Sequence, residues 1–216
     1  MNLIYNTAQI PIRGSFPAHE LYSVCQNNNR TGNFSIARDL ALKAHAGVYY
    51  QPENIPYTTH LYKVVECLHK IYDGSFNLDF ASSVGWLHDV VEDTPITMND
   101  LHVLFPNQIC MGVSALTKNK KLSKYEQMID SIDRITKQPK EVALVKMADR
   151  IANLSNPHLC WSIEKKQYYL NEASLILSRL AFSGRKMAQQ LEIAIKNYEN
   201  KAFSLTNKVG NKVEVI

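Results

Sequence analysis

The spacing of apolar residues constrains the fold most strongly, because they recur every three or four positions from about residue 33 to about residue 202. This spacing places them on one face of successive α-helices, whereas a half-buried strand would alternate every second residue. The last residues, KVEVI, alternate like a strand. The sequence therefore predicts an all-α fold, a multi-helix bundle with short connections in one domain.

Capping and breaking residues indicate where these helices begin and end. Small polar side chains and proline favour helix N-termini, and glycine favours helix C-termini. Helices are expected from Asn33 to Gly47, from Pro56 to Gly74, through FASSVGWLHDVVED to Pro95, after the capping-box patterns Thr97/Asp100 and Ser123/Glu126, from Pro139, and from about Ser162 to about Ala202.

Residues 1–30 are polar and irregular, and they end in the asparagine-rich run QNNNRTGN. We expect an N-terminal extension at residues 1–30, a helical domain at residues 31–202 and a C-terminal tail at residues 203–216. A chain of 216 residues is long enough for one large domain with such extensions.

Composition narrows the class of protein. The net charge of +4, from 24 Lys and Arg against 20 Asp and Glu, is weaker than in a dedicated nucleic-acid binder, so no DNA partner is expected. No stretch approaches the ~18 consecutive apolar residues of a membrane helix, and the N-terminus lacks the features of a signal peptide. The four scattered cysteines are typical of free thiols. We therefore expect a cytoplasmic protein with no membrane partner.

Chemistry-bearing residues gather in the segment GWLHDVVEDT. On a helix, His88 shares a face with Glu92, and Asp89 shares a face with Asp93, because each pair is four residues apart. One imidazole and three carboxylates on a mostly apolar helix are costly unless a cation neutralises them. The alternative for this segment alone is a solvent-facing acidic helix end.

Two further polar residues lie in otherwise apolar helical segments. His60 begins the segment HLYKVVECLHK, and Asp149 lies in VALVKMADRIANL. Taken singly, His60 suits a buried core histidine, and Asp149 suits a salt-bridged residue on an exposed stripe. Together with His88 and Asp89, they would supply two nitrogen and two carboxylate ligands from three helices.

Such a mixed ligand set suits one first-row cation, manganese or iron, with coordination positions left for water and substrate oxygen. Zinc usually takes fewer oxygen ligands in a closed tetrahedron, so it ranks lower. A bound cation lowers the pKa of its water ligand, and Glu92 or Asp93 could orient that water or protonate a leaving group. The sequence thus predicts a hydrolytic metal centre.

A basic cluster lies between the two halves of this predicted centre in sequence. Its lysines suit either a solvated loop between helices or the attraction of phosphate groups. They are Lys118, Lys120, Lys121 and Lys124, in TKNKKLSK.

Taken together, these segments resemble the HD superfamily of metal-dependent phosphohydrolases. More narrowly, they resemble the hydrolase domain of RelA/SpoT-type proteins and the stand-alone small alarmone hydrolases. HDVVEDT followed by KMADRIANL is far more specific than a bare His-Asp pair. The matching segments run in the family's order from about residue 33 to about residue 155: ARDLALKAHAG, PYTTHLYKVVECL, ASSVGWLHDVVEDT, ITMNDLHVLFPNQICMGVSALTKNKK and VALVKMADRIANL.

The resemblance implies an HD-domain bundle with a single metal centre and removal of the 3′-pyrophosphate from ppGpp or pppGpp. It implies one manganese ion, held by His60, His88, Asp89 and Asp149, with water activation by Glu92 and Asp93. It also implies a set of substrate-binding residues: Asn153 at the sugar, Tyr169 near the base, and Lys118 and Lys124 on the phosphate side.

Two departures from the family pattern concern the region around the metal-binding histidine. Typical members carry a basic Arg-Lys step beside the guanine, but the stretch VYYQPENIPY has no basic residue. Tyr49 or Tyr50 could stack on a purine there, with less polar discrimination between bases. Leu61 replaces the proline that usually follows the histidine, a change we expect to be structural and mild.

Two alternatives to a ppGpp hydrolase therefore stay open. One is a related phosphohydrolase that acts on ppApp, a pyrophosphorylated tRNA 3′ end or another 3′-phosphorylated nucleotide. The other is a module that binds the alarmone without turnover, against which the complete Glu92 and Asp93 pair argues. Oligomer formation is compatible with either.

Overall fold

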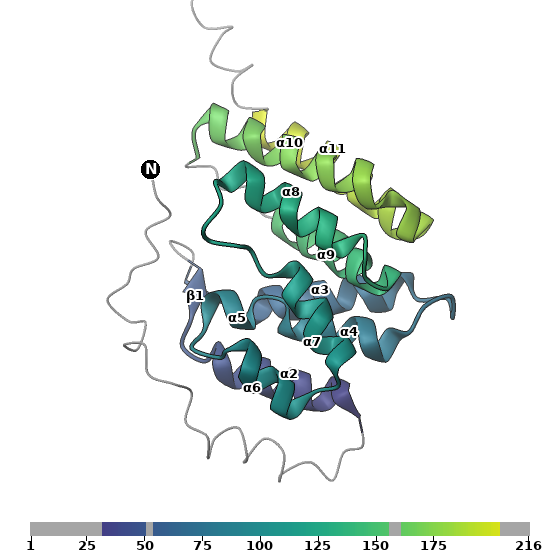
Figure 1. Ribbon diagram of the computed structural model, residues 1–216. Helices are drawn as coiled ribbons and strands as arrows, with labels where there is room; N and C mark the ends of the chain where they lie inside the picture. Colours follow the sequence, from purple (N-terminus) through teal and green to yellow (C-terminus); the bar gives the residue numbers. More distant parts are fainter. Residues whose placement is uncertain (1–31, 51–53, 156–160, 204–216) are drawn as a thin grey trace, which may run out of the picture.

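The computed structural model describes residues 32–50, 54–155 and 161–203. Over these residues the protein is a bundle of helices, which confirms the all-α prediction (Figure 1). The helices are α2 (Asn33–Ala44), α3 (Thr58–Ile71), α4 (Leu78–Leu87), α5 (Val90–Asp93), α6 (Met98–Leu104), α7 (Asn107–Leu116), α8 (Lys124–Ile135), α9 (Lys140–Leu154), α10 (Ile163–Leu180), the short 3-10 helix η2 (Ala181–Ser183) and α11 (Arg185–Phe203).

Helix α9 occupies the middle of the bundle. It contacts α3 and α4 on one side and α10 and α11 on the other, and α10 and α11 lie side by side at one end of the molecule (Figure 1). Nearly every residue of α9 is buried, as expected for a helix enclosed by other helices. Polar residues of α9 therefore lie in the interior, where they need partners.

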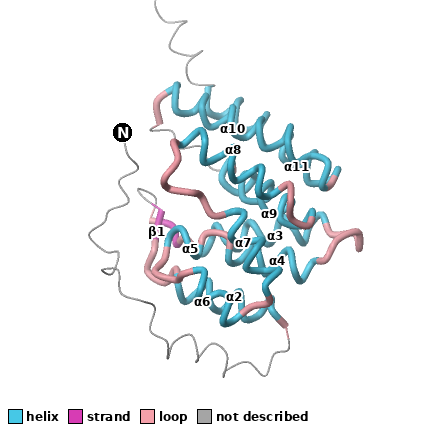
Figure 2. Tube along the Cα trace, viewed as in Figure 1, coloured by secondary structure: helices cyan, strands magenta, loops and turns pink. Residues whose placement is uncertain are grey.

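A two-stranded antiparallel sheet precedes α3, and the sequence pattern did not predict it (Figure 2). Strand β1 (Tyr49–Tyr50) pairs with β2 (Ile55–Pro56), so that Tyr50 lies opposite Ile55. Strands of two residues are too short to show the alternation that identifies a strand in a sequence. The hairpin brings Tyr50 close to Tyr57, the residue before α3.

The third expected helix forms two helices instead, α4 and α5, which meet at His88 and Asp89. The Nδ1 atom of His88 donates to the carbonyl oxygen of Gly85 at 2.8 Å. The carbonyl oxygen of Asp89 accepts from the N–H groups of Glu92 and Asp93, so a new helix begins there. The prediction of one continuous helix was wrong because apolar periodicity does not register local side chain–backbone hydrogen bonds.

The stretch expected to be helical from Ser162 to Ala202 is divided between α10 and α11, with η2 and Gly184 between them. A Cβ atom at Gly184 would lie 2.8 Å from Cδ2 of the buried Leu144 in α9. The absence of a side chain at Gly184 therefore lets this connection approach α9 closely.

Two of the expected helix starts carry complete capping boxes. Thr97 with Asp100 caps α6, and Ser123 with Glu126 caps α8, which confirms both predictions. The N-cap of α2, in contrast, is Gly32 rather than the expected asparagine, and no side chain caps that helix.

No helix among the described residues is long and apolar enough to cross a membrane. The strand-like ending KVEVI and the extension at residues 1–30 lie outside the described residues. The division of the chain into residues 1–30, 31–202 and 203–216 therefore stays a prediction.

Candidate metal centre

The predicted metal ligands come from three places in the bundle. His60 lies in the first turn of α3, His88 and Asp89 form the junction between α4 and α5, and Asp149 lies in α9. Helix α3 packs against both α4 and α9, so these three places meet inside the molecule.

Three of these side chains converge in the interior. Nε2 of His60 lies 3.2 Å from Nε2 of His88 and 3.4 Å from Oδ1 of Asp149. The distance from Nε2 of His88 to Oδ1 of Asp149 is 3.8 Å. All three side chains are buried, and their ligand atoms lie within 4.8 Å of one another, a grouping that could hold a metal ion.

Asp89 adds a second carboxylate to this group. Its Oδ2 atom lies 2.7 Å from Nε2 of His88 and 3.7 Å from Nε2 of His60. The same oxygen accepts a hydrogen bond of 2.5 Å from the hydroxyl of Tyr57. Two imidazoles and two carboxylates therefore surround one position, a donor set that suits a divalent first-row cation.

The ring of His88 is oriented for metal binding. A carbonyl oxygen only accepts, so the contact with Gly85 places a proton on Nδ1 and turns Nε2 toward the other ligands. Burial lowers the pKa of His88, but the charges of Asp89 and Asp149 outweigh burial and raise the pKa to about 9. The two carboxylates thus favour positive charge at this position, which a divalent cation would supply.

Asp149 is held by side chains one turn away on either side of it along α9. Nζ of Lys146 lies 3.1 Å from Oδ2, and Nδ2 of Asn153 donates to Oδ1 at 2.6 Å. Burial raises the pKa of Asp149, but Lys146 and the two imidazoles lower it well below its usual range. Asp149 therefore stays ionised and fixed in orientation, as a metal ligand must be.

Glu92 and Asp93, the two carboxylates that follow His88 and Asp89 in the chain, have different surroundings. Oε1 of Glu92 accepts from the backbone N–H of Lys118 at 2.7 Å, and Oε2 lies 3.1 Å from the ammonium of the same lysine. Asp93 reaches solvent, but desolvation by the surrounding protein and the charges of Asp89 and Glu92 raise its pKa to about 6. Asp93 can therefore exchange a proton near neutral pH, whereas both oxygens of Glu92 are engaged.

The predicted substrate residues divide into those at the centre and those away from it. Asn153 binds Asp149 directly, Lys118 binds Glu92, and the ring of Tyr50 meets the ring of His60 edge-on at 6.3 Å. Lys124 is exposed at the start of α8.

Tyr169 lies in α10, where the guanidinium of Arg150 covers its ring at 4.3 Å. Arg150 is buried and also pairs with Glu172 at 3.3 Å. Because Arg150 follows Asp149 in the chain, this packing supports the part of α9 that carries this predicted ligand.

Sequence reasoning missed two residues that touch the predicted ligands, Tyr57 and Lys146. Lys146 lies three residues before Asp149, so helical spacing alone places both on one face. Tyr57 gives no such signal, because its contact with Asp89 joins residues 32 positions apart in the chain.

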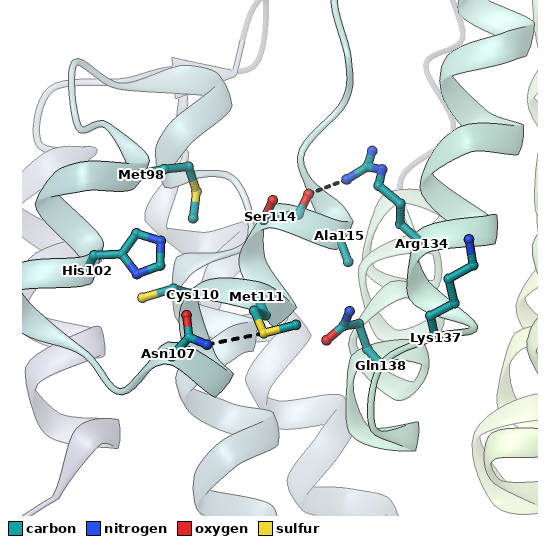
Figure 3. A pocket seen from close by; sticks show the side chains of 10 residues that line it. All are labelled: Met98, His102, Asn107, Cys110, Met111, Ser114, Ala115, Arg134, Lys137 and Gln138. Atoms are coloured by element: carbon teal, nitrogen blue, oxygen red, sulfur yellow. Dashed lines mark hydrogen bonds between the residues drawn. The ribbon is translucent and has the colours of Figure 1, made fainter.

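A cavity of about 350 Å³ lies elsewhere, between α6, α7 and α8 (Figure 3). None of the predicted metal ligands lines it, so we do not assign the hydrolytic site there. Its lining residues are Met98, His102, Asn107, Cys110, Met111, Ser114, Ala115, Arg134, Lys137 and Gln138.

The fold and the site together define a class of protein, an all-helical domain with a buried histidine–aspartate group that could hold a metal ion. The chain belongs to the HD domain family, because the family model described as HD domain matches residues 37–182.

Individual proteins similar to this chain carry hydrolase names. The guanosine-3′,5′-bis(diphosphate) 3′-pyrophosphohydrolase MESH1 of Mus musculus is 28% identical over 159 residues, which cover 71% of this chain and 86% of MESH1. The Homo sapiens protein of that name is 27% identical over 165 residues, 74% of this chain and 91% of its own length. The bifunctional (p)ppGpp synthase/hydrolase SpoT of Escherichia coli K12 is 33% identical over 128 residues, 56% of this chain and 17% of SpoT.

A solved structure shares the fold. It is described as a metazoan orthologue of SpoT that hydrolyses ppGpp, and it is 24% identical to this chain with a TM-score of 0.66. The match covers 79% of this chain and 97% of that one.

Proposed function

We propose that this protein is a manganese-dependent (p)ppGpp 3′-pyrophosphohydrolase that removes pyrophosphate from the 3′ position of guanosine alarmones. The observation that carries the proposal is the buried convergence of His60, His88 and Asp149, with Asp89 beside them. The names of the similar MESH1 and SpoT proteins supply the substrate class.

His60, His88, Asp89 and Asp149 would hold one cation, and two nitrogen with two oxygen ligands favour manganese over zinc. When bound, the cation would activate water and neutralise charge on the phosphoryl oxygens. The protein's part is to fix these ligands, which Gly85, Lys146, Asn153 and Tyr57 do through hydrogen bonds and an ion pair.

In the proposed reaction a water oxygen forms a bond to the phosphorus attached to the ribose 3′-oxygen, and the bond between that phosphorus and the 3′-oxygen breaks. Asp93 accepts a proton from the water, because its pKa of about 6 leaves it mostly ionised at neutral pH. The 3′-oxygen leaves with a proton, and the products are pyrophosphate and the nucleoside 5′-diphosphate or 5′-triphosphate.

The basic loop between α7 and α8 would face the phosphates. Burial lowers the pKa of Lys118, but the negative charges of Glu92, Asp89 and Asp149 more than offset burial and raise this pKa. Lys118 therefore remains positive and would stabilise negative charge on the phosphoryl oxygens. Asn153, which touches Asp149, would contact the sugar.

The residues expected near the purine base support a second candidate substrate. Tyr50 stacks on Tyr57 with ring centroids 5.0 Å apart, and the stretch VYYQPENIPY contains no basic residue that would read a guanine. A flat aromatic surface accepts any purine, so ppApp and a pyrophosphorylated tRNA 3′ end are the alternatives to test.

The decisive experiment incubates the purified full-length protein with manganese and ppGpp and quantifies pyrophosphate and GDP. Asp89→Ala and the double variant Glu92→Ala/Asp93→Ala should abolish product, whereas Asp133→Ala, an exposed carboxylate on α8, should leave it unchanged. Intact ppGpp after prolonged incubation would refute the proposal. Binding of ppGpp without product would favour a sensing module, and parallel assays with ppApp and pyrophosphorylated tRNA would separate the substrates.

A further inference from the structure

Tyr57 lies against the metal centre without being one of its predicted ligands. It is the N-cap residue of α3 and is 5% exposed. Its hydroxyl donates to Oδ2 of Asp89 at 2.5 Å. Burial and the charge of Asp89 raise the pKa of Tyr57 well above its usual value, so the hydroxyl stays protonated and remains a donor.

The same hydroxyl also interacts with Asp93. Its hydrogen bond opposes the rise in the pKa of Asp93 that burial and the neighbouring carboxylates cause. One phenol group therefore binds a predicted metal ligand, Asp89, and lowers the pKa of the carboxyl proposed to accept the proton.

The ring of Tyr57 is clamped between two other rings. His45 stacks on it with centroids 5.0 Å apart and planes inclined by 12°, and Tyr50 stacks with centroids 5.0 Å apart and planes inclined by 28°. His45 is itself buried and is fixed by a 2.9 Å hydrogen bond between Nδ1 and the carbonyl oxygen of Ala41. The backbone N–H of Tyr57 donates to the carbonyl oxygen of Val48 at 2.9 Å.

The hydroxyl is therefore held in place from α2, from the β-hairpin and from the start of α3. A donor fixed in this way leaves its acceptor little freedom to turn. Polar groups that hold a metal-ligating side chain typically change metal affinity by roughly 10- to 100-fold when they are removed.

We propose that Tyr57 is a positioning residue that fixes Asp89 for cation binding, with His45 and Tyr50 clamping its ring. This rests on the proposed function only in assuming that the centre binds a divalent cation. It extends that function by assigning a role to a residue outside the ligand set and by assigning the stacked rings of His45 and Tyr50 the role of holding Tyr57.

The test measures manganese binding to the full-length protein in the absence of nucleotide. Binding is quantified by calorimetry and by the electron paramagnetic resonance signal of free manganese. Tyr57→Phe keeps the stacked ring and removes the hydroxyl, and we expect roughly 10- to 100-fold weaker binding. The matched control is Tyr62→Phe, on the same helix, where the half-exposed ring packs edge-on against Trp86 and binding should not change. Wild-type affinity in Tyr57→Phe would overturn the proposal.

Two further measurements separate positioning from a general structural role. Saturating manganese should restore most of the turnover of Tyr57→Phe but none of that of Asp93→Asn. A turnover defect in Tyr57→Phe that manganese does not relieve would count against positioning.

Tyr50→Leu keeps the hydroxyl of Tyr57 and removes one of the two rings that stack on it. A few-fold loss of manganese affinity in this variant would support the clamp even if Tyr57→Phe were poorly folded. Unchanged manganese affinity in Tyr50→Leu would refute the proposed clamping of the Tyr57 ring. Failure of the wild-type protein to bind manganese would instead refute the metal centre itself.

Discussion

Lys118 binds the carboxylate of Glu92 twice, through its backbone N–H at 2.7 Å and through its ammonium at 3.1 Å. Lys120 adds a 3.1 Å contact to the backbone carbonyl of Glu92. The basic loop is thereby attached to α5, next to the candidate metal centre. Glu92 and Asp93 are adjacent in the chain, but Glu92 is occupied by lysine and Asp93 is not.

This difference predicts unequal effects of neutral substitutions at the two carboxylates. Asp93→Asn removes the group that we propose accepts the proton, and it should lower kcat by roughly 10²- to 10⁴-fold. Glu92→Gln keeps an oxygen for the N–H of Lys118 and should lower kcat much less. Steady-state pyrophosphate release at saturating manganese measures both, and equal losses would show that the carboxylates act as one unit.

Lys118→Met should raise the KM for ppGpp more than it lowers kcat, because it removes a positive charge from the proposed phosphate side of the site. The effect should be non-additive with Glu92→Gln, since each change breaks the same ion pair. Lys137→Met changes the same charge beside the cavity shown in Figure 3 and serves as the control. Strict additivity of the Lys118 and Glu92 substitutions would contradict this account.

The fold could be predicted from the sequence where local chemistry determines structure. The helical periodicity and the capping boxes at Ser123 and Thr97 depend on residues within one turn of each other, and both predictions are confirmed. The junction at His88 and Asp89 could not be predicted, because it depends on a hydrogen bond from the imidazole of His88 to Gly85.

The candidate site shows the same division. His60, His88, Asp89 and Asp149 could be named from residue types and order along the chain, and the structure brings them together. Their surroundings could not be named, since the contact between Tyr57 and Asp89 depends on how the β-hairpin and α3 pack against the α4–α5 junction.

Gly184→Ala should destabilise the protein by about 1–3 kcal/mol, the usual cost of overpacking a close contact. The added Cβ would lie 2.8 Å from Cδ2 of Leu144, which is buried and has little room to move. Urea unfolding followed by circular dichroism measures the loss. Adding Leu144→Val to Gly184→Ala should recover part of the stability lost in the single glycine variant. An unchanged urea midpoint in Gly184→Ala alone would show that the connection between α10 and α11 can move away from Leu144.

The pKa of His88 predicts that stability depends on pH in the metal-free protein and not in the manganese-loaded protein between pH 6.5 and 9. Folding raises this pKa from about 6.5 to about 9, so its contribution to stability is complete below pH 6.5 and is lost as pH rises through 9. Asp93 adds a loss of the same sign between about pH 4 and pH 6, because its pKa is also raised. The melting temperature in EDTA should therefore fall as pH increases from 6.5 to 9.

Bound manganese cancels this trend, because the cation must displace the proton from Nε2 of His88. Below pH 9 the apparent affinity for manganese should rise about tenfold for each pH unit, as expected when binding releases one proton. The melting temperatures with manganese and with EDTA should thus diverge as pH rises from 6.5 to 9. His102→Gln, an exposed histidine on α6, should preserve the divergence, and His88→Gln should abolish it. A difference that stays constant with pH would mean that His88 holds no proton that manganese displaces.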